Sequence, residues 1–267
     1  MPQELLYVYC IYSGPLIDWK KELLCPFTIF IINGFQVVVK NVSSEDYSEA
    51  YFKNKVSDLP WLDKQVREHI AVISNFMQIG TVIPFKFGTI YHSVSNLTLF
   101  LHQYSNSLQD QLLHLENKEE WSVKMYGDIP IMSKKIDQLS MEAAKIENQI
   151  QSSTPGKAFL LKKKKQLFVE EEIESICIKK SEFILDLLKL ESFAFNLNVL
   201  QTKEITGRVD EMILNACFLV KRNDLQRFQK VIAQYQDSIL SDGFKMETTG
   251  PWPPFSFISI KENKNAS

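Results

Sequence analysis

The sequence predicts an α+β protein made of two small domains, and three features of the chain support this class. Short runs rich in β-branched and aromatic residues end at Gly, Pro, Asn or Ser, which is typical of strands. Longer segments repeat apolar residues at the spacing of an amphipathic helix. Both kinds of segment occur in each half of the 267-residue chain, which indicates sheets layered with helices.

The N-terminal region predicts a strand, a short helix and a hairpin. Residues 5–12 form the first strand, which ends in a Ser-Gly-Pro turn, and residues 18–24 predict the short helix. A β-hairpin is predicted over residues 27–42, because Asn33 and Gly34 accept the positive φ of a type I′ turn. The first hairpin strand is continuously apolar, so we expect it to be covered on both faces.

A helix, a strand and a second helix follow the hairpin. The first helix begins at Pro60, with Asp58 as its cap, and ends at Gly80. The strand over residues 81–91 is interrupted by a proline and a glycine, which indicates an edge position, a bulge or a strand end. Residues 95–116 repeat leucines and aromatic residues at helical spacing and predict the second helix.

The second half of the chain opens with a strand that places Trp121, Val123 and Met125 on one face. Residues 129–151 then predict a helix, which ends in a Ser-Ser-Thr-Pro-Gly break. The following long stretch contains neither Pro nor Gly, and it predicts one long helix, or two with a kink. We therefore expect a helical hairpin over about residues 129–205.

The C-terminal region predicts further strands around one helix. Residues 212–220 form a buried strand, and a helix that starts at Asn223 or Asp224 continues to about residue 240. A strand follows an Asp-Gly turn, and residues 255–260 predict a final strand. We assign residues 1–117 to an N-terminal domain and residues 118–267 to a C-terminal domain that carries the helical hairpin.

The chain shows no pattern of a catalytic, metal or cofactor site. Its four histidines lack metal-ligand spacing, and Walker, GxGxxG and GxSxG motifs are absent from the sequence. A net charge of −2 provides no basic field for nucleic acid or acidic lipid, and no apolar run is long enough to span a bilayer. Without a signal peptide or paired cysteines, we expect a cytoplasmic protein with reduced thiols.

Two segments place aromatic residues beside proline within strand-like surroundings. The first contains Phe85, Lys86 and Phe87, and the second contains Trp252 and Phe255. These side chains could form exposed contacts for a partner, or they could pack under a helix or between domains. For Trp252 we expect a ring that fills a gap beside the final strand, and its replacement by Ala would then cost about 3–5 kcal/mol.

A run of four lysines and a run of three glutamates lie about two turns apart in the predicted long helix. The lysines occupy positions 162–165 and the glutamates positions 170–172. Such runs are usually a solvated helix face with opposite charges. The lysine run could instead bind an acidic surface on a partner.

The chain resembles the gas vesicle protein F/L family over nearly its whole length. The resemblance rests on the opening strand LYVYCIY, the segment VIPFKFGTIY, the strand EEWSVKMYG and the segment TGPWPPFSF, which agree with the family in order and spacing. Two departures are Lys86, where the family usually has arginine, and Ser122, where it usually has glycine. Lysine keeps the charge of arginine but loses its bidentate fork, so a carboxylate clamp at this position would be looser.

The resemblance implies a non-enzymatic role in gas vesicles, the gas-filled protein shells of buoyant prokaryotes. It implies two α+β domains, of which the first is ferredoxin-like, and a minor structural component or assembly factor located at the gas vesicle within the cytoplasm. The implied partners are the small hydrophobic major shell protein and other accessory vesicle proteins. A ferredoxin-like module that binds a small regulatory molecule remains an alternative, although it rests only on fold-level analogy. An enzyme would need histidines or carboxylates that converge in a cleft.

Overall fold

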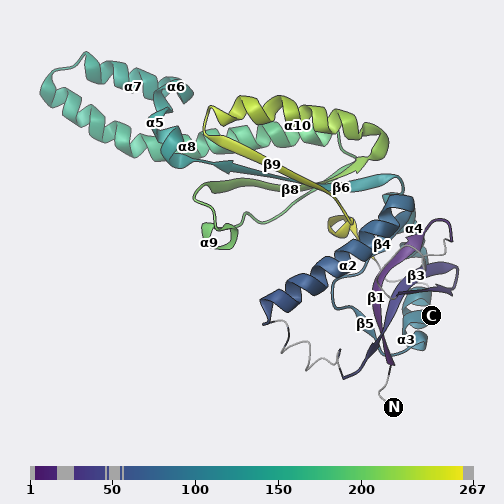
Figure 1. The fold of residues 1–267 in the computed structure, drawn as a ribbon. Coiled ribbons are helices and arrows are strands. Elements are labelled where there is room, and N and C mark those ends of the chain that lie inside the picture. The colour runs from purple at the N-terminus through teal and green to yellow at the C-terminus, as the bar shows by residue number, and fades with distance from the viewer. Residues whose placement is uncertain (1–3, 17–26, 46, 48–54, 56, 261–267) are drawn as a thin grey trace. The chain divides into compact units, whose positions relative to one another are not determined.

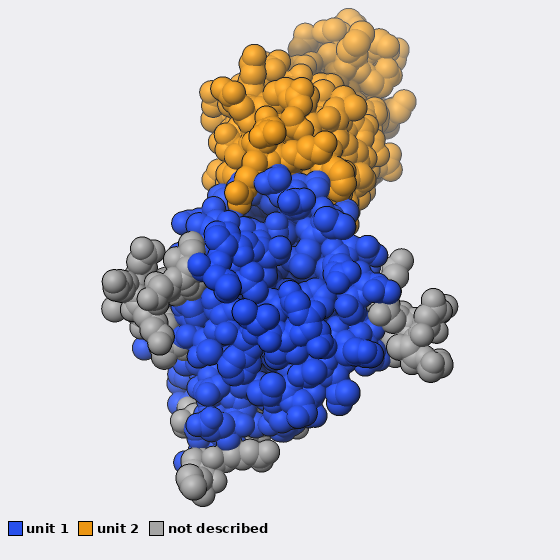
Figure 2. Space-filling view, turned by 90° about the vertical axis from the view of Figure 1, so that its right-hand side faces the viewer, with its two compact units in different colours: residues 1–120, 251–267 blue, residues 121–250 orange. Residues whose placement is uncertain are grey.

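The computed structural model describes residues 4–16, 27–45, 47, 55 and 57–260. The chain forms two compact units, one made of residues 1–120 and 251–267 and the other of residues 121–250 (Figure 2). The domain boundary at residue 117 stays a prediction, and the compact units divide after Glu120 and after Gly250. The segment that begins at Pro251 belongs to the first unit, whereas the predicted C-terminal domain included it. Gln111 donates a hydrogen bond to this segment, and Glu120 accepts one from it. That each unit is an independent folding domain stays a prediction.

The first unit contains a sheet with the strand order β2-β3-β1-β4, in which β5 also pairs with β1 (Figure 1). Strand β1 pairs antiparallel with β3, β4 and β5, and β2 pairs antiparallel with β3. This order is that of a ferredoxin-like sheet. The strands are β1 (Glu4–Ser13), β2 (Thr28–Ile32), β3 (Phe35–Ser43), β4 (Thr81–Pro84) and β5 (Ile90–Tyr91), and the helices are α2 (Leu59–Ile79), α3 (Val94–Gln103) and α4 (Ser105–Leu115).

Several local predictions for the first unit are confirmed. The hairpin turns at Asn33 and Gly34, which both have positive φ, at 50° and 80°. Asp58 caps α2 by accepting a hydrogen bond from the backbone N–H of Trp61 at 3.2 Å. Strand β4 stops at Pro84, as expected of a proline in a strand. The helix expected over residues 18–24 and Cys25 lie outside the described residues.

Two predictions for the first unit are wrong. The first hairpin strand, β2, is not covered on both faces, because it lies at the edge of the sheet and leaves Ile31 64% exposed. Strand β1, between β3 and β4, is the strand that is buried on both faces. The helix over residues 95–116 is also divided into α3 and α4 at Tyr104, where φ is −105° and ψ is 12°. The Tyr104 ring packs there against Phe100, with centroids 4.9 Å apart.

The second unit has the strand order β7-β8-β6-β9, which repeats the order of the first unit position by position (Figure 1). Helices α8 and α10 contribute buried residues to one core together with the strands. The strands are β6 (Lys118–Gly127), β7 (Ala194–Leu197), β8 (Glu211–Lys221) and β9 (Phe244–Trp252), and the helices are α5 (Ile129–Lys134), α6 (Ile136–Leu139), α7 (Met141–Gln151), α8 (Pro155–Leu190), α9 (Lys203–Thr206) and α10 (Leu225–Leu240). Short 3₁₀ helices occupy Arg222–Asp224 and Phe255–Phe257.

The helical hairpin is present but shorter than predicted. Helices α7 and α8 pack against each other, whereas α8 ends at Leu190 and the chain then forms the edge strand β7. Residues 129–151 form three helices, because Lys135 and the extended Ser140 interrupt them. The final strand expected over residues 255–260 is absent, and a 3₁₀ turn occupies its first three residues. Residues 211–221 and 244–252 form strands, which confirms the predicted strands in those regions.

Candidate functional site

The candidate site is an aromatic cluster around His69 in the first unit. His69 lies on the apolar face of α2 and is buried. Its ring stacks on Tyr9, with centroids 5.5 Å apart, and more distantly on Phe255, at 6.5 Å. Phe87 and Tyr7 meet it edge to face, at 5.8 and 5.6 Å. The cluster therefore joins β1, α2, the segment after β4 and the C-terminal segment.

A β-bulge in β1 helps to place Tyr9 against His69. Val8 pairs with Val39 and Cys10 with the adjacent Val38, so Tyr9 is the extra residue in the strand. The bulge brings both Tyr9 and Cys10 into the same core cluster, which strict alternation along a strand would not allow.

Both ring nitrogens of His69 are occupied by hydrogen bonds. The Nε2 atom is 2.9 Å from the Phe85 carbonyl oxygen, and the Nδ1 atom is 2.8 Å from the hydroxyl of Tyr7. Because a carbonyl can only accept, Nε2 carries the hydrogen and Nδ1 accepts from Tyr7. The backbone N–H of Gly88 in turn donates to the Tyr7 hydroxyl at 3.4 Å. These hydrogen bonds hold both ends of the Phe85–Gly88 turn. They leave neither ring nitrogen of His69 free to act as a base.

Burial controls the protonation of this cluster. Desolvation lowers the pKa of His69 from its ordinary value, and the hydrogen bond to the Phe85 carbonyl partly offsets that change. Burial also raises the pKa of the Tyr7 hydroxyl. Both groups are therefore neutral near pH 7, which suits a structural hub better than acid–base catalysis.

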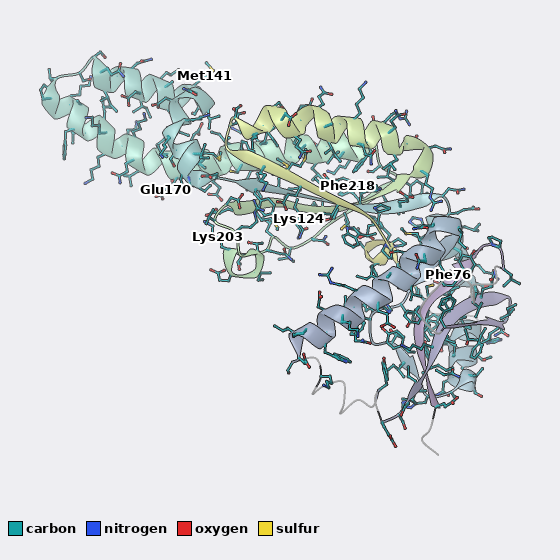
Figure 3. All side chains as sticks on the ribbon, in the orientation of Figure 1. Phe76, Lys124, Met141, Glu170, Lys203 and Phe218 are labelled. Atoms are coloured by element: carbon teal, nitrogen blue, oxygen red, sulfur yellow. The ribbon has the colours of Figure 1, made fainter. Side chains whose placement is uncertain are left out.

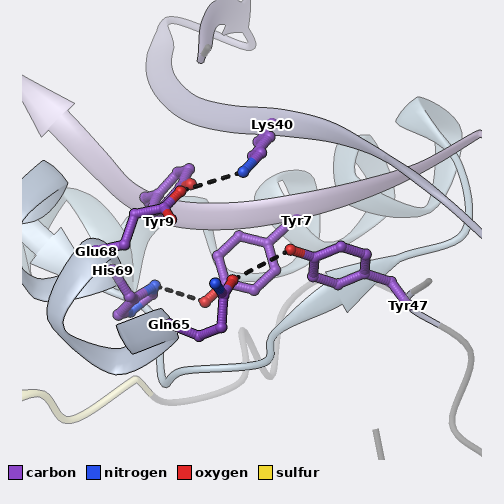
Figure 4. Close-up of a pocket in the computed structure, with 7 residues that line it drawn as sticks. All are labelled: Tyr7, Tyr9, Lys40, Tyr47, Gln65, Glu68 and His69. Carbon is purple, nitrogen blue, oxygen red and sulfur yellow. Dashed lines mark hydrogen bonds and ion pairs between the residues drawn. The ribbon is translucent and has the colours of Figure 1, made fainter. Parts of the chain in front are cut away.

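A small cavity adjoins the cluster, as Figure 4 shows. Across it, Lys40 and Glu68 form an ion pair at 3.1 Å, and the Tyr47 hydroxyl donates to the Gln65 side chain at 3.4 Å. Its volume is about 10 Å³, which is room for about one water molecule. The cavity is too small for a metabolite, so it does not support the alternative of a small-molecule module.

Two buried polar side chains hold the C-terminal segment. The Glu120 carboxylate accepts from the backbone N–H and the hydroxyl of Ser256, at 2.9 and 2.6 Å. Gln111 donates to the Phe257 carbonyl and accepts from the backbone N–H of Ser259, both at 2.9 Å. Buried hydrogen bonds therefore hold the C-terminal segment in place, since polar groups that are buried need such partners.

The structure gathers three of the five predicted site residues around His69. The Phe87 and Phe255 rings contact it directly, and the Phe85 carbonyl accepts its hydrogen bond while the Phe85 ring packs against Phe100 at 5.8 Å. Lys86 is exposed at the tip of the turn. Trp252 is the last residue of β9.

The ring of Trp252 does not fill a gap in the core as the sequence suggested. It is 39% exposed, and the neighbouring Phe255 is 36% exposed. The buried members of this segment are instead Pro253, Pro254 and Phe257. Pro253 and Pro254 thus pack inward, and the aromatic residues on either side of them, Trp252 and Phe255, reach solvent.

Sequence reasoning missed most of the residues that build the cluster. The sequence predicts Tyr7 and Tyr9 only as residues of the first strand, and nothing in it marks Tyr47, Gln111 or Glu120. Helical spacing puts His69 near the apolar face of the predicted helix that begins at Pro60, which is a weak indication of a buried histidine. In the described part of the chain, no group of three or more His, Cys, Asp or Glu side chains is arranged to hold a metal ion.

A second polar cluster lies in the other unit. Arg208 makes a bidentate pair with Asp210, with both N–O distances at 2.7 Å, and it also contacts Glu247 at 2.7 Å. Its guanidinium lies over the Tyr126 ring, 4.1 Å from the centroid. Hydrogen bonding to Arg208 lowers the pKa of Asp210. Because each charge is paired, this cluster ties the loop before β8 to the sheet and offers no free reactive group.

Comparisons with known proteins agree with this architecture. The family model "Gas vesicle synthesis protein GvpL/GvpF" matches residues 5–259. A gas vesicle protein L from a Streptomyces species is 24% identical over 97% of this chain and 94% of the relative, and one from Haloferax mediterranei is 20% identical over 90% and 74%. Crystal structures of GvpF from an Anabaena species and from Microcystis aeruginosa share the fold. The Anabaena structure has a TM-score of 0.70 and 18% sequence identity, and the match covers 97% of this chain and 100% of that one. The Microcystis structure has a TM-score of 0.63 and 17% identity, and the match covers 95% of this chain and 98% of that one. None of the helices in the described ranges is long and apolar enough to cross a membrane.

Proposed function

Because the chain belongs to the GvpL/GvpF family of gas vesicle proteins, we propose that it is a non-enzymatic minor component or assembly factor of the vesicle. It acts at the gas vesicle within the cytoplasm, where it binds the small hydrophobic major shell protein and other accessory proteins. The proposed contact surface contains Phe85, Lys86, Phe87, Trp252 and Phe255.

One observation carries this proposal, namely the exposure of Trp252 and Phe255 on a segment that is firmly held. Large aromatic rings are the residues that dominate protein–protein interfaces. The hydrogen bonds of Gln111 and Glu120 limit the movement of the segment, so little conformational entropy is lost when a partner binds. A hydrophobic shell subunit is the kind of partner that such a surface would cover.

The other proposed residues have different parts in this surface. Phe87 and the Phe85 carbonyl connect the turn to His69, so they fix the position of the surface. Lys86 extends from the tip of the turn and supplies a positive charge. A charged group at the rim of an interface influences the association rate and the choice of partner more than the affinity.

The test is a binding measurement with purified shell protein. A W252S/F255S variant removes both exposed rings, and L113S removes a more exposed leucine elsewhere in the same unit as a control. We expect W252S/F255S to weaken binding at least about tenfold, since interface hot spots typically contribute more than about 1 kcal/mol each.

Circular dichroism separates loss of binding from loss of folding in this experiment. Both variants should keep the spectrum of the wild type, because each replaced residue is more than a third exposed and lies outside the buried core. Equal binding by W252S/F255S and wild type would contradict the proposed surface. A wild-type protein that binds neither the shell protein nor any accessory vesicle protein would contradict the proposed function itself.

A further inference from the structure

The exposed face of α8 carries a stripe of residues that nothing in the described unit covers. The stripe has the spacing of a coiled-coil seam, with steps of four and three residues. Its members are Leu160, Lys164, Leu167, Glu171, Glu174 and Ile178, and every one of them is exposed. The three apolar members, Leu160, Leu167 and Ile178, are 66%, 72% and 50% exposed. An isolated exposed leucine is ordinary, but three at this spacing on one helix indicate a surface that a second helix covers.

Charge divides the stripe into two halves. Lys164 lies in its N-terminal half with Lys163 beside it, and Glu171 and Glu174 lie in its C-terminal half with Glu170 beside them (Figure 3 labels Glu170). Among the residues that the structure describes, none of these five side chains forms an ion pair. Glu170 and Glu174 are four residues apart on the helix, so they repel each other within the single chain. The stripe therefore has charges that a partner of suitable pattern would neutralise.

Lys165 shows that the lysine run is not merely a solvated face. It pairs with Asp137 at 2.5 Å and with Glu147 at 2.8 Å, and so it holds α8 to α6 and α7. Lys163 and Lys164 point to the other side of the helix, because residues one and two positions away are turned by about 100° and 200°. The lysine run therefore contributes to two surfaces of α8. The surface with Lys165 packs against α6 and α7, and the surface with Lys163 and Lys164 has no ion-pair partner among the described residues.

We infer that the partner of the stripe is the same stripe of a second copy of this chain, packed antiparallel. Only an antiparallel arrangement sets the basic half of one α8 against the acidic half of the other. The two-fold axis then lies beside Val169, the midpoint of the stripe. Leu160 meets Ile178, Lys164 meets Glu174 and Leu167 meets Glu171 of the second copy. Each such contact occurs twice, as in any isologous dimer. The polar seam positions weaken the pairing but fix its direction.

A groove beside the stripe completes the match. It has a volume of about 400 Å³ and lies between α8 and the start of β8. Ile173, Ile178 and Met212 contribute apolar lining, and Glu170 and Glu174 contribute carboxylates. Glu170 and Cys177 line the groove from one side of the stripe. Phe159 and Lys163 lie on that same side of α8, because a helix turns about 100° per residue. In the antiparallel pair, the exposed Phe159 of one copy reaches the level of this groove in the other.

The dimer does not depend on the proposed shell-protein contact, since all of these residues lie in the unit of residues 121–250.

Charge-reversal variants of the full chain test the dimer by sedimentation velocity. The wild type should associate reversibly with increasing concentration. K164E and E174K should each raise the dissociation constant at least about tenfold, because positions 164 and 174 then carry like charges that face each other twice. An equimolar mixture of the two variants should restore association, since each contact in the mixed dimer is again between opposite charges. K179E has the same change in net charge as K164E at an exposed position off the stripe, and it should associate like the wild type.

Each other result overturns the inference. A wild type that is monomeric up to about 1 mM has no relevant self-association. Variants that associate like the wild type would place the dimer on another surface. A mixture that stays monomeric would mean that the stripe binds a different protein, because the reversed charges cannot then complement each other. Circular dichroism of each variant excludes unfolding as the cause.

Discussion

His69 is a single residue that connects segments far apart in the sequence. Its ring nitrogens bind Tyr7 and the Phe85 carbonyl, and its faces meet rings from β1 and from the C-terminal segment. The sequence placed His69 near the apolar face of its helix, because helical spacing is a local property. It could not give the partners, since Tyr7 is 62 residues away and Ser256 is 136 residues from Glu120. Such pairings depend on the tertiary fold.

The lowered pKa of His69 predicts a specific dependence of stability on pH. Because the folded protein holds this ring neutral, the unfolded chain takes up a proton at higher pH than the folded one. Its contribution to the free energy of unfolding is therefore complete above the ordinary pKa of 6.5, and it falls as the pH drops through that value towards the lower pKa of the folded state. The surrounding polar and charged groups are Tyr7, Tyr9, Lys40, Tyr47, Gln65 and Glu68.

Urea unfolding of the wild type and of H69Q between about pH 8 and pH 5 measures this effect. At pH 8 the variant should be less stable by about 1–3 kcal/mol, because it leaves buried partners unsatisfied. The difference should shrink as the pH is lowered, since only the wild type must exclude a proton from a buried imidazole. A constant difference over this pH range would contradict the assignment of a neutral, buried His69.

At the scale of elements, turns and caps were predictable and burial was not. The Asn33–Gly34 turn and the Asp58 cap depend on local backbone geometry, which the residue types reveal. Whether a strand is central or at an edge depends on its neighbours, and for this reason the apolar β2 was misjudged. Strand β7 was missed for a related reason. It is a half-exposed edge strand after a long helix, and its residues lack the glycine or proline that would have marked the boundary.

The end of α2 gives a prediction for one element. Gly80 caps this helix, and a Cβ at this position would lie 2.5 Å from the Ser13 carbonyl oxygen and 2.5 Å from the Tyr12 ring. We expect G80A to lower the free energy of unfolding by about 1–3 kcal/mol, because the backbone of β1 and the end of α2 must separate. The measurement is urea-induced unfolding.

A second glycine provides the matched control. Gly156 lies in the first turn of α8, and a Cβ there would have no neighbour within 4 Å. G156A should leave stability unchanged or raise it by up to about 1 kcal/mol, since alanine favours a helix. Equal effects of the two substitutions would show that crowding at the end of α2 is not the cause.

At the scale of the whole molecule, the two units share one strand order. The order β2-β3-β1-β4 corresponds to β7-β8-β6-β9, with the long helical hairpin inserted between β6 and β7 of the second unit. The sequence showed only a loose repetition of strands and helices, because the two halves differ in helix length and share no evident motif. The return of the C-terminal segment to the first unit had no signal in composition or periodicity.

Because the C-terminal segment packs in the first unit, its removal should destabilise that unit specifically. A chain that ends after Trp252 keeps all of β9 but loses the partners of Gln111 and Glu120. Each buried group left unpaired costs about 1–3 kcal/mol. Hydrogen exchange should therefore become faster in α2, α4 and β1 of the first unit, whereas α8, α10 and β8 keep their protection. Equal loss of protection in both units, or none in either, would show that the segment does not specifically stabilise the first unit.

The most direct test of the proposed role is vesicle formation in a host from which the gene for this chain has been deleted. Electron microscopy counts gas vesicles after the wild type, W252S/F255S or L113S is supplied at equal levels. We predict that deletion abolishes or sharply reduces vesicles, that the wild type and L113S restore them, and that W252S/F255S does not. Normal vesicles without the protein, or full restoration by W252S/F255S, would contradict the account.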